Sequence, residues 1–156
     1  MKPNLIMLLA WLMLSCTTVT PITPSQSADD LIIRSGTSFG FCIGYCNKTL
    51  ELTANKVIFT NNSSHDQLKY PTKTCAGTVS AATWATLKAA LTNTGFSQES
   101  EIIGCPDCAD GGAEFIEIEQ SGKKHRVTFE YGKTIPGFGK LVMTLRDERE
   151  KFKECK

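Results

Sequence analysis

Hydrophobic and polar residues alternate on both sides of the Ser121-Gly122 pair, which is the two-residue turn signal of a β-hairpin. Counting outward from this turn predicts four cross-strand pairs: Glu119–Lys124 and Glu117–Arg126 on one face, and Ile118–His125 and Ile116–Val127 on the other. One register therefore brings opposite charges together on one face and less polar side chains together on the other. A slip of one residue would break both sets, so the pattern predicts the hairpin and its register.

An earlier alternating stretch predicts a second hairpin. Residues 49–53 alternate between polar and apolar, and residues 56–60 are rich in side chains that favour strands. Ala54 and Asn55 lie between them and suit a turn, and the polar residues 61–66 are expected to form a surface loop.

Apolar residues at helical spacing predict two helices, over residues 80 to about 93 and about 137 to 153. Ser80 suits the N-cap of the first helix, and Asp147 and Lys151 have the spacing of an i,i+4 ion pair on the second. The two apolar stripes are Trp84, Leu87 and Leu91, and then Phe138, Leu141, Leu145 and Phe152.

Each half of the chain thus runs from a pair of cysteines through a hairpin to a helix. This order predicts the α+β class, with an antiparallel sheet of two hairpins and two helices packed on one face. We expect residues 31–156 to form a single domain, because about 125 residues suit one hydrophobic core.

The N-terminus carries the signature of export. Lys2 precedes an unbroken apolar run over Leu5–Leu14, which has the length of a signal-peptide core and is too short to span ~30 Å of hydrocarbon as a helix. The run ends in Ser15-Cys16, which resembles the lipobox of bacterial lipoproteins. The resemblance implies a signal peptide over residues 1–15 and a lipid on Cys16 that anchors the chain to a membrane of the bacterial cell envelope.

Residues 16–30 are rich in Thr, Ser and Pro and are expected to form a flexible tether between the lipid and the domain. An ordinary secretory signal cut after Ala28 is the alternative, and it would leave a secreted protein without an anchor.

Charge argues against one class of partner. The whole chain has 17 basic and 16 acidic residues, and the only charged residue among the first fifteen is Lys2. The exported part is therefore close to neutral and has no basic block, so nucleic acid is not expected as a partner.

Six cysteines remain after Cys16: Cys42, Cys46, Cys75, Cys105, Cys108 and Cys155. An even number in an exported chain indicates disulfide bonds, although six cysteines allow fifteen pairings and the spacing does not choose among them. A disulfide at Cys155 would hold the end of the second helix against the domain. A zinc site is the alternative for Cys42, Cys46, Cys105 and Cys108, because their C-x3-C and C-x2-C spacings suit zinc ligands.

Cys105 and Cys108 also form the C-x-x-C motif of thiol–disulfide proteins. In such enzymes a helix N-terminus stabilises the thiolate, whereas here Asp110-Gly111-Gly112 and then a strand are expected to follow. Asp107 and Asp110 would disfavour a thiolate, so a structural disulfide is the main interpretation and a redox role the alternative.

Cys42-Ile43-Gly44-Tyr45-Cys46 stands directly before the earlier hairpin. Over residues 31–131 the chain resembles small uncharacterised bacterial envelope lipoproteins that carry C-x-G-x-C before an alternating strand. The resemblance implies an exported α+β domain and no known activity.

No catalytic constellation is recognisable. His65 lies in a polar loop, His125 is expected on the apolar face of its hairpin, and a nucleophile motif such as G-x-S-x-G is missing. Asp107, Asp110 and Glu114 do not have EF-hand spacing and are interpreted as a solvated acidic loop. We therefore expect a non-catalytic binding or interaction module without a cofactor, which contacts the membrane through its lipid and binds an unknown protein or small ligand. The alternatives are an envelope thiol–disulfide protein that uses Cys105 and Cys108, or a zinc-stabilised adaptor.

Overall fold

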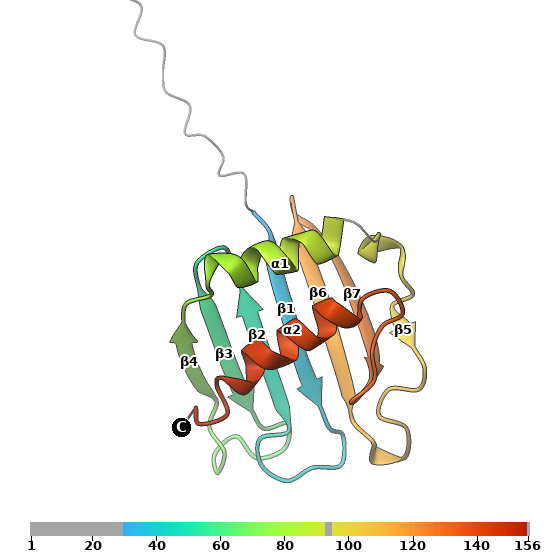
Figure 1. Cartoon of the computed structure of the whole chain (residues 1–156). Coiled ribbons are helices and arrows are strands. Elements are labelled where there is room, and N and C mark those ends of the chain that lie inside the picture. The colour runs from blue at the N-terminus through green and yellow to red at the C-terminus, as the bar shows by residue number, and fades with distance from the viewer. Residues whose placement is uncertain (1–29, 93–94, 156) are drawn as a thin grey trace, which may run out of the picture.

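The computed structural model of this chain describes residues 30–92 and 95–155. The signal segment 1–15, the lipidation residue Cys16 and residues 17–29 of the expected tether lie outside the described residues. In the described part, strands and α-helices follow one another as β1 (Ile32–Ser38), β2 (Asn47–Leu52), β3 (Val57–Asn62), β4 (Lys73–Gly77), α1 (Ala81–Thr92), β5 (Ile102–Ile103), β6 (Ala113–Gln120), β7 (Lys123–Glu130) and α2 (Gly139–Glu150) (Figure 1). Two short 3-10 turns, Phe96–Gln98 and Cys108–Asp110, complete the order.

The sheet has seven strands in the order β4-β3-β2-β1-β6-β7-β5. Every neighbouring pair is antiparallel except β5 and β7, which run parallel. The α+β class with a mainly antiparallel sheet is therefore confirmed, but a sheet of only two hairpins is wrong. The central strand β1 joins the hairpin β2–β3 to the hairpin β6–β7, and β4 and β5 extend the two edges.

Both predicted hairpins form. In the later one, the pairs Glu119–Lys124, Ile118–His125, Glu117–Arg126 and Ile116–Val127 all have the expected register. In the earlier one, Leu52 lies opposite Val57 across the turn, and Leu50 lies opposite Phe59. The period-two pattern was sufficient here because each hairpin pairs residues that are close in sequence.

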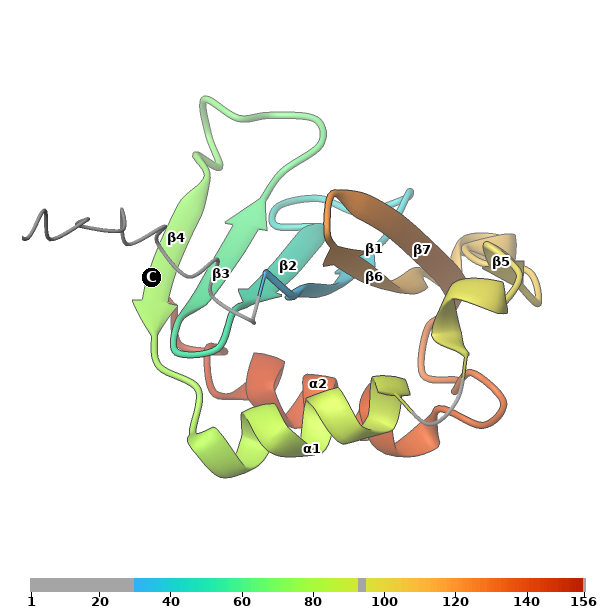
Figure 2. The same ribbon diagram turned by 90° about the horizontal axis from the view of Figure 1, so that it is seen from above.

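Figure 2 shows α1 and α2 on the same side of the sheet. The inward side chains of the strands and of both helices belong to one buried cluster, which includes Ile33, Leu50, Trp84, Val127 and Leu145. Removing side chains of this size from water stabilises a fold by about 1.5–3 kcal/mol each. The other side of the sheet carries no helix in the described part of the chain.

Both helices form close to the predicted ranges, and only the second ends earlier than expected. Ser80 caps α1, because its Oγ accepts a 3.0 Å hydrogen bond from the backbone N–H of Thr83. The helix α2 ends at Glu150, and the expected pairing of Asp147 with Lys151 is wrong: Lys151 lies 2.6 Å from Glu148 instead. Glu148 is buried whereas Asp147 is exposed, so the ammonium neutralises the carboxylate that has less access to water.

The six cysteines of the domain lie as three pairs at disulfide distance: Cys42–Cys46, Cys75–Cys155 and Cys105–Cys108, with Cα–Cα distances of 5.7, 6.0 and 5.5 Å. The pair Cys75–Cys155 joins the edge strand β4 to the segment after α2, as the position of Cys155 suggested. Beside it, the rings of Phe152 and Phe59 stack at 5.6 Å. Within residues 30–92 and 95–155, no helix is long and apolar enough to cross a membrane.

Candidate binding site

A row of polar side chains crosses the helix-covered face of the sheet. At one end of β1, Thr37 pairs with Lys48 of β2 and with Glu114 of β6, so the three residues lie at one level on adjacent strands. Further along the same face, the strands carry apolar residues such as Ile33, Leu50 and Ile116. On β2 and β6 the inward face therefore changes from apolar to polar at this level, and on β1 the change begins one pair earlier, at Ser35.

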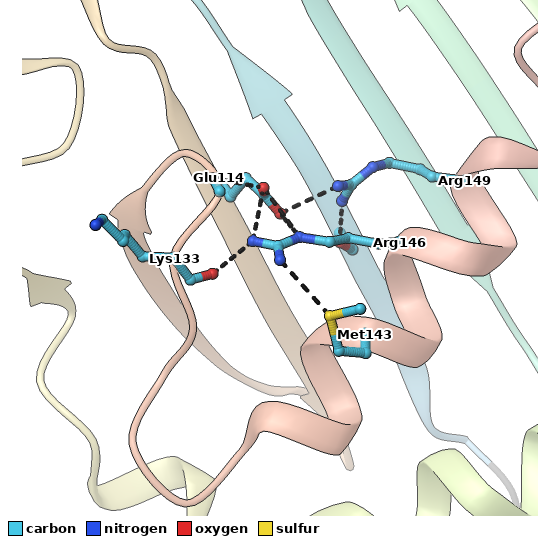
Figure 3. Close-up of polar contacts among 7 residues, drawn as sticks. Glu114, Lys133, Met143, Arg146 and Arg149 are labelled. Carbon is cyan, nitrogen blue, oxygen red and sulfur yellow. Dashed lines mark hydrogen bonds and ion pairs between the residues drawn. The ribbon is translucent and has the colours of Figure 1, made fainter.

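Glu114 is the acidic member of this row and lies on β6. Its side chain is 3% exposed, which corrects its interpretation as part of a solvated acidic loop. The carboxylate accepts hydrogen bonds of 3.1 Å from Arg146 Nε and of 3.1 Å from Arg149 Nη2 (Figure 3). The backbone N–H of Gly132 donates a further bond of 3.1 Å to Oε1. Both carboxylate oxygens are thus occupied, as a buried charge requires.

The two arginines come from α2 and lie three residues apart, which places them on one side of the helix. Arg149 also donates a 2.7 Å hydrogen bond from Nη1 to Ser35 Oγ of β1, and Arg146 donates from Nη2 to the carbonyl oxygen of Lys133. The side chain of Arg149 is 10% exposed and that of Arg146 is 21% exposed. The helix, the central strand and β6 are therefore held together by polar contacts at this end of the core.

Positive charge exceeds negative charge at this place. Two guanidinium groups share the single buried carboxylate of Glu114. Lys48 makes no ion pair among residues 30–92 and 95–155, and Lys153 lies 3.6 Å from an exposed carboxylate, that of Glu150. These four cations border a cavity of about 380 Å³ together with two carboxylates, those of Glu114 and Glu150, and Thr37, Phe39 and Tyr131 also line it.

The sequence was compared with known protein families and with curated proteins. No protein-family model matches this chain, and no curated protein matches it. The resemblance to envelope lipoproteins therefore stays a prediction.

The cysteines considered as zinc ligands are arranged in two separate pairs, Cys42–Cys46 and Cys105–Cys108. Among residues 30–92 and 95–155, no group of three or more His, Cys, Asp or Glu side chains is arranged to hold a metal ion. The C-x-x-C motif leads into a three-residue 3-10 turn, Cys108–Asp110, rather than an α-helix.

Carboxylates surround the C-x-x-C loop. Asp107 Oδ2 accepts a hydrogen bond from Gly40 N and its Oδ1 accepts one from Gly112 N, at 3.1 and 3.0 Å. Glu130 Oε1 accepts one from Cys105 N at 3.0 Å. This environment opposes the formation of a thiolate.

The two histidines lie apart from the cationic cavity. His65 is exposed in the loop after β3. The ring of His125 meets that of Phe96 edge-on at 5.7 Å, which agrees with its expected place on the less polar face. His125 borders a second cavity of about 550 Å³, together with Leu31, Phe96 and Ile118.

Sequence reasoning missed the cluster of Glu114, Arg146 and Arg149. One signal was present: Glu114 occupies an inward position of a strand whose following inward residues are Ile116 and Ile118. A charge at the start of an apolar face indicates a partner in the folded state. The partners themselves lie 32 and 35 residues away in the sequence.

Proposed function

We propose that this chain is a lipid-anchored, disulfide-stabilised protein of the bacterial envelope that binds a small anion without catalysis. The anion would occupy the cavity between the end of the sheet and α2, and its chemistry would be that of a carboxylate or a phosphate. The observation that carries the proposal is the charge imbalance at one cavity, which two largely buried arginines and two lysines border together with the carboxylates of Glu114 and Glu150.

Taking guanidinium groups out of water is costly unless each is balanced by negative charge, and Glu114 balances only one of the two. A bound anion would balance the second and would accept bonds in the forked geometry that guanidinium groups provide. Thr37, which is buried beside the cavity, could donate its hydroxyl to the same ligand.

Binding suits these residues better than acid–base catalysis. Glu114, the carboxylate nearest the arginines, already accepts hydrogen bonds at both oxygens and serves to position Arg146 and Arg149. The proposal takes both helices to be packed on one face of the sheet, so that α2 forms one wall of the cavity. Location in the cell envelope and anion binding are two separate claims, and each is tested by its own experiment.

The binding claim is tested by titrating the purified protein with inorganic phosphate and with succinate in a calorimeter. Lys48→Gln should weaken binding several-fold without changing the melting temperature, because Lys48 is exposed and forms no ion pair in the described part of the chain. Lys56→Gln is the matched control, since Lys56 is an exposed lysine at the far end of β2 and β3. Absence of binding by the unaltered protein, or equal effects of both substitutions, would contradict the claim.

Location at a membrane of the cell envelope is tested by the substitution Cys16→Ser. This change should prevent lipid attachment and move the protein out of the membrane fraction. Two or more acyl chains hold a protein firmly on a membrane, whereas one binds only marginally. Soluble unaltered protein that begins near residue 29 would instead support secretion.

A thiol–disulfide role for Cys105 and Cys108 is the second candidate. The observation in its favour is that both residues are exposed at the protein surface, where another protein's disulfide could reach them. The neighbouring carboxylates argue against it, and the rate at which reduced Cys105 is alkylated separates the two candidates.

A further inference from the structure

Three of the most exposed large hydrophobic side chains of the described residues lie in two neighbouring loops. Phe41 and Ile43 are 88% and 91% exposed in the loop between β1 and β2, and Leu68 is 100% exposed in the loop between β3 and β4. Both loops lie at the end of the sheet away from Asp30, at the bottom of Figure 1. We call residues 39–46 and 63–72 the tip loops.

The tip loops contact each other and are held in shape. The rings of Tyr45 and Tyr70 meet edge-on at 5.8 Å, and the hydroxyl of Tyr45 donates a 3.1 Å hydrogen bond to the carbonyl oxygen of Pro71. The pair Cys42–Cys46 closes a tight turn in which Gly44 has a φ of 100°, a value that favours glycine. Phe41 and Ile43 are therefore presented to solvent on a constrained loop, and clustered apolar side chains of this kind mark interaction surfaces.

Lysines and carboxylates both lie near these side chains: Asp107 accepts a hydrogen bond from Gly40 N in the first tip loop, and two lysines lie beside the tyrosines. The ammonium group of Lys73 lies 4.6 Å from the centre of the Tyr45 ring, and that of Lys69 lies 5.3 Å from the centre of the Tyr70 ring. Asp66 is the one acidic residue in the tip loops, and its carboxylate accepts a 2.9 Å hydrogen bond from the backbone N–H of Lys69. The tip thus combines apolar side chains at its surface with tyrosines and lysines beside them.

We propose that the tip loops insert into an anionic lipid surface. Phe41, Ile43 and Leu68 would enter the region where headgroups meet acyl chains, and Tyr45 and Tyr70 would lie at headgroup level, where tyrosine is enriched. Lys69 and Lys73 would meet the anionic headgroups. A lipid surface fits this composition better than a protein partner, because protein interfaces are depleted in lysine and enriched in arginine, and the tip loops contain no arginine.

The test locates the contact by hydrogen exchange, so that a lipid on Cys16 cannot by itself produce the signal. The full chain as purified is mixed with vesicles of phosphatidylglycerol and phosphatidylcholine, or of phosphatidylcholine alone. We expect backbone exchange in residues 39–46 and 63–72 to slow at least threefold with the anionic vesicles and much less with the neutral ones. Equal exchange with and without anionic vesicles, or equal slowing by both kinds, would overturn the proposal.

Two variants complete the test. The triple substitution Phe41→Ser, Ile43→Ser and Leu68→Ser should abolish the slowing, whereas Ile102→Ser should not, although Ile102 is also 64% exposed. Lys69→Gln should weaken the vesicle interaction about fivefold, from about 1 kcal/mol for each lysine near an anionic surface. Equal slowing in the triple variant and the unaltered chain would overturn the proposal, provided that their circular dichroism spectra agree.

Two further measurements distinguish other sources of protection. Slowing that increases with protein concentration in the absence of vesicles would identify a second copy as the partner and overturn the proposal. Slowing of residues 41–46 and 63–72 by inorganic phosphate alone would do the same, because it would assign the effect to a free anion. Phe39 lines the cavity beside Glu114, so residues 39–40 are left out of this comparison, and anion binding in the cavity stays a separate outcome.

Discussion

Arg34 of β1 and Glu119 of β6 lie 2.7 Å apart on the face of the sheet opposite the helices. The same guanidinium group also contacts Glu51 of β2 at 2.7 Å and Glu117 of β6 at 3.0 Å. A single arginine on the central strand therefore bridges carboxylates from both of its neighbours. The hydrogen bond to Arg34 lowers the pKa of Glu119, with a smaller contribution from Lys124.

A dependence of stability on pH follows from this lowered pKa. A carboxylate with a lower pKa in the folded state stabilises the fold above its unfolded pKa of about 4.3, and the stabilisation is lost as the pH falls through the folded value. The melting temperature of Glu119→Gln should therefore fall below that of the unaltered protein at pH ~7 and approach it below pH ~4. Thermal unfolding followed by circular dichroism measures the difference, and a difference that grows at low pH would contradict this account.

The buried cluster of Glu114, Arg146 and Arg149 predicts a large loss of stability. Glu114→Leu would leave two largely buried guanidinium groups without their carboxylate, and the free energy of unfolding should fall by about 3–5 kcal/mol. Urea denaturation measures the change. Glu150→Gln on α2, the helix that carries both arginines, is the control. It should cost well under 1 kcal/mol, because the exposed ion pair of Glu150 with Lys153 contributes little.

The disulfide pairs should differ in their contributions to stability. Cys75 and Cys155 are separated by 80 residues in the sequence, and Cys42 and Cys46 by 4. Closing the longer loop restricts the unfolded chain more, so replacing both members of the first pair by Ala should cost roughly 4–5 kcal/mol, against about 2 for the second. Denaturation of the two double variants measures this order, and a larger loss from the short loop would show that native contacts, rather than chain entropy, dominate.

Cys105 should be a slow nucleophile once its disulfide is reduced. Glu130 contacts its backbone N–H and Asp107 lies in the same loop, so negative charge opposes a thiolate, and no α-helix N-terminus offsets it. At pH ~6, well below the free-thiol pKa of about 8.5, we expect Cys105 to be alkylated no faster than free cysteine. Rapid alkylation would favour the thiol–disulfide role over the binding role.

Local sequence predicted the parts of the fold that depend on neighbours along the chain. The register of β6 and β7 followed from the Ser121-Gly122 turn and from side chains that alternate on either side of it. The start of α1 followed from Ser80. In each case the residues that interact are separated by a few positions, so the pattern that specifies the contact can be read within one short window.

Only the tertiary structure placed β1 at the centre of the sheet. The middle of this strand is Ser35, Gly36 and Thr37, which lack the apolar side chains by which a central strand is recognised in a sequence. Its partner strands begin at residues 47 and 113, so the pairing is not visible in a short stretch of sequence. Gly36 is needed because a Cβ at this position would collide with the carbonyl oxygen of Lys48 and with the ring of Phe115. The same distant pairing brings Lys48, Thr37 and Glu114 to one level, and α2 contributes Arg146 and Arg149, which bind Glu114. The six cysteines predicted disulfides, but their partners and the cationic cavity depend on contacts between remote segments, which no local pattern of hydrophobic and polar residues specifies.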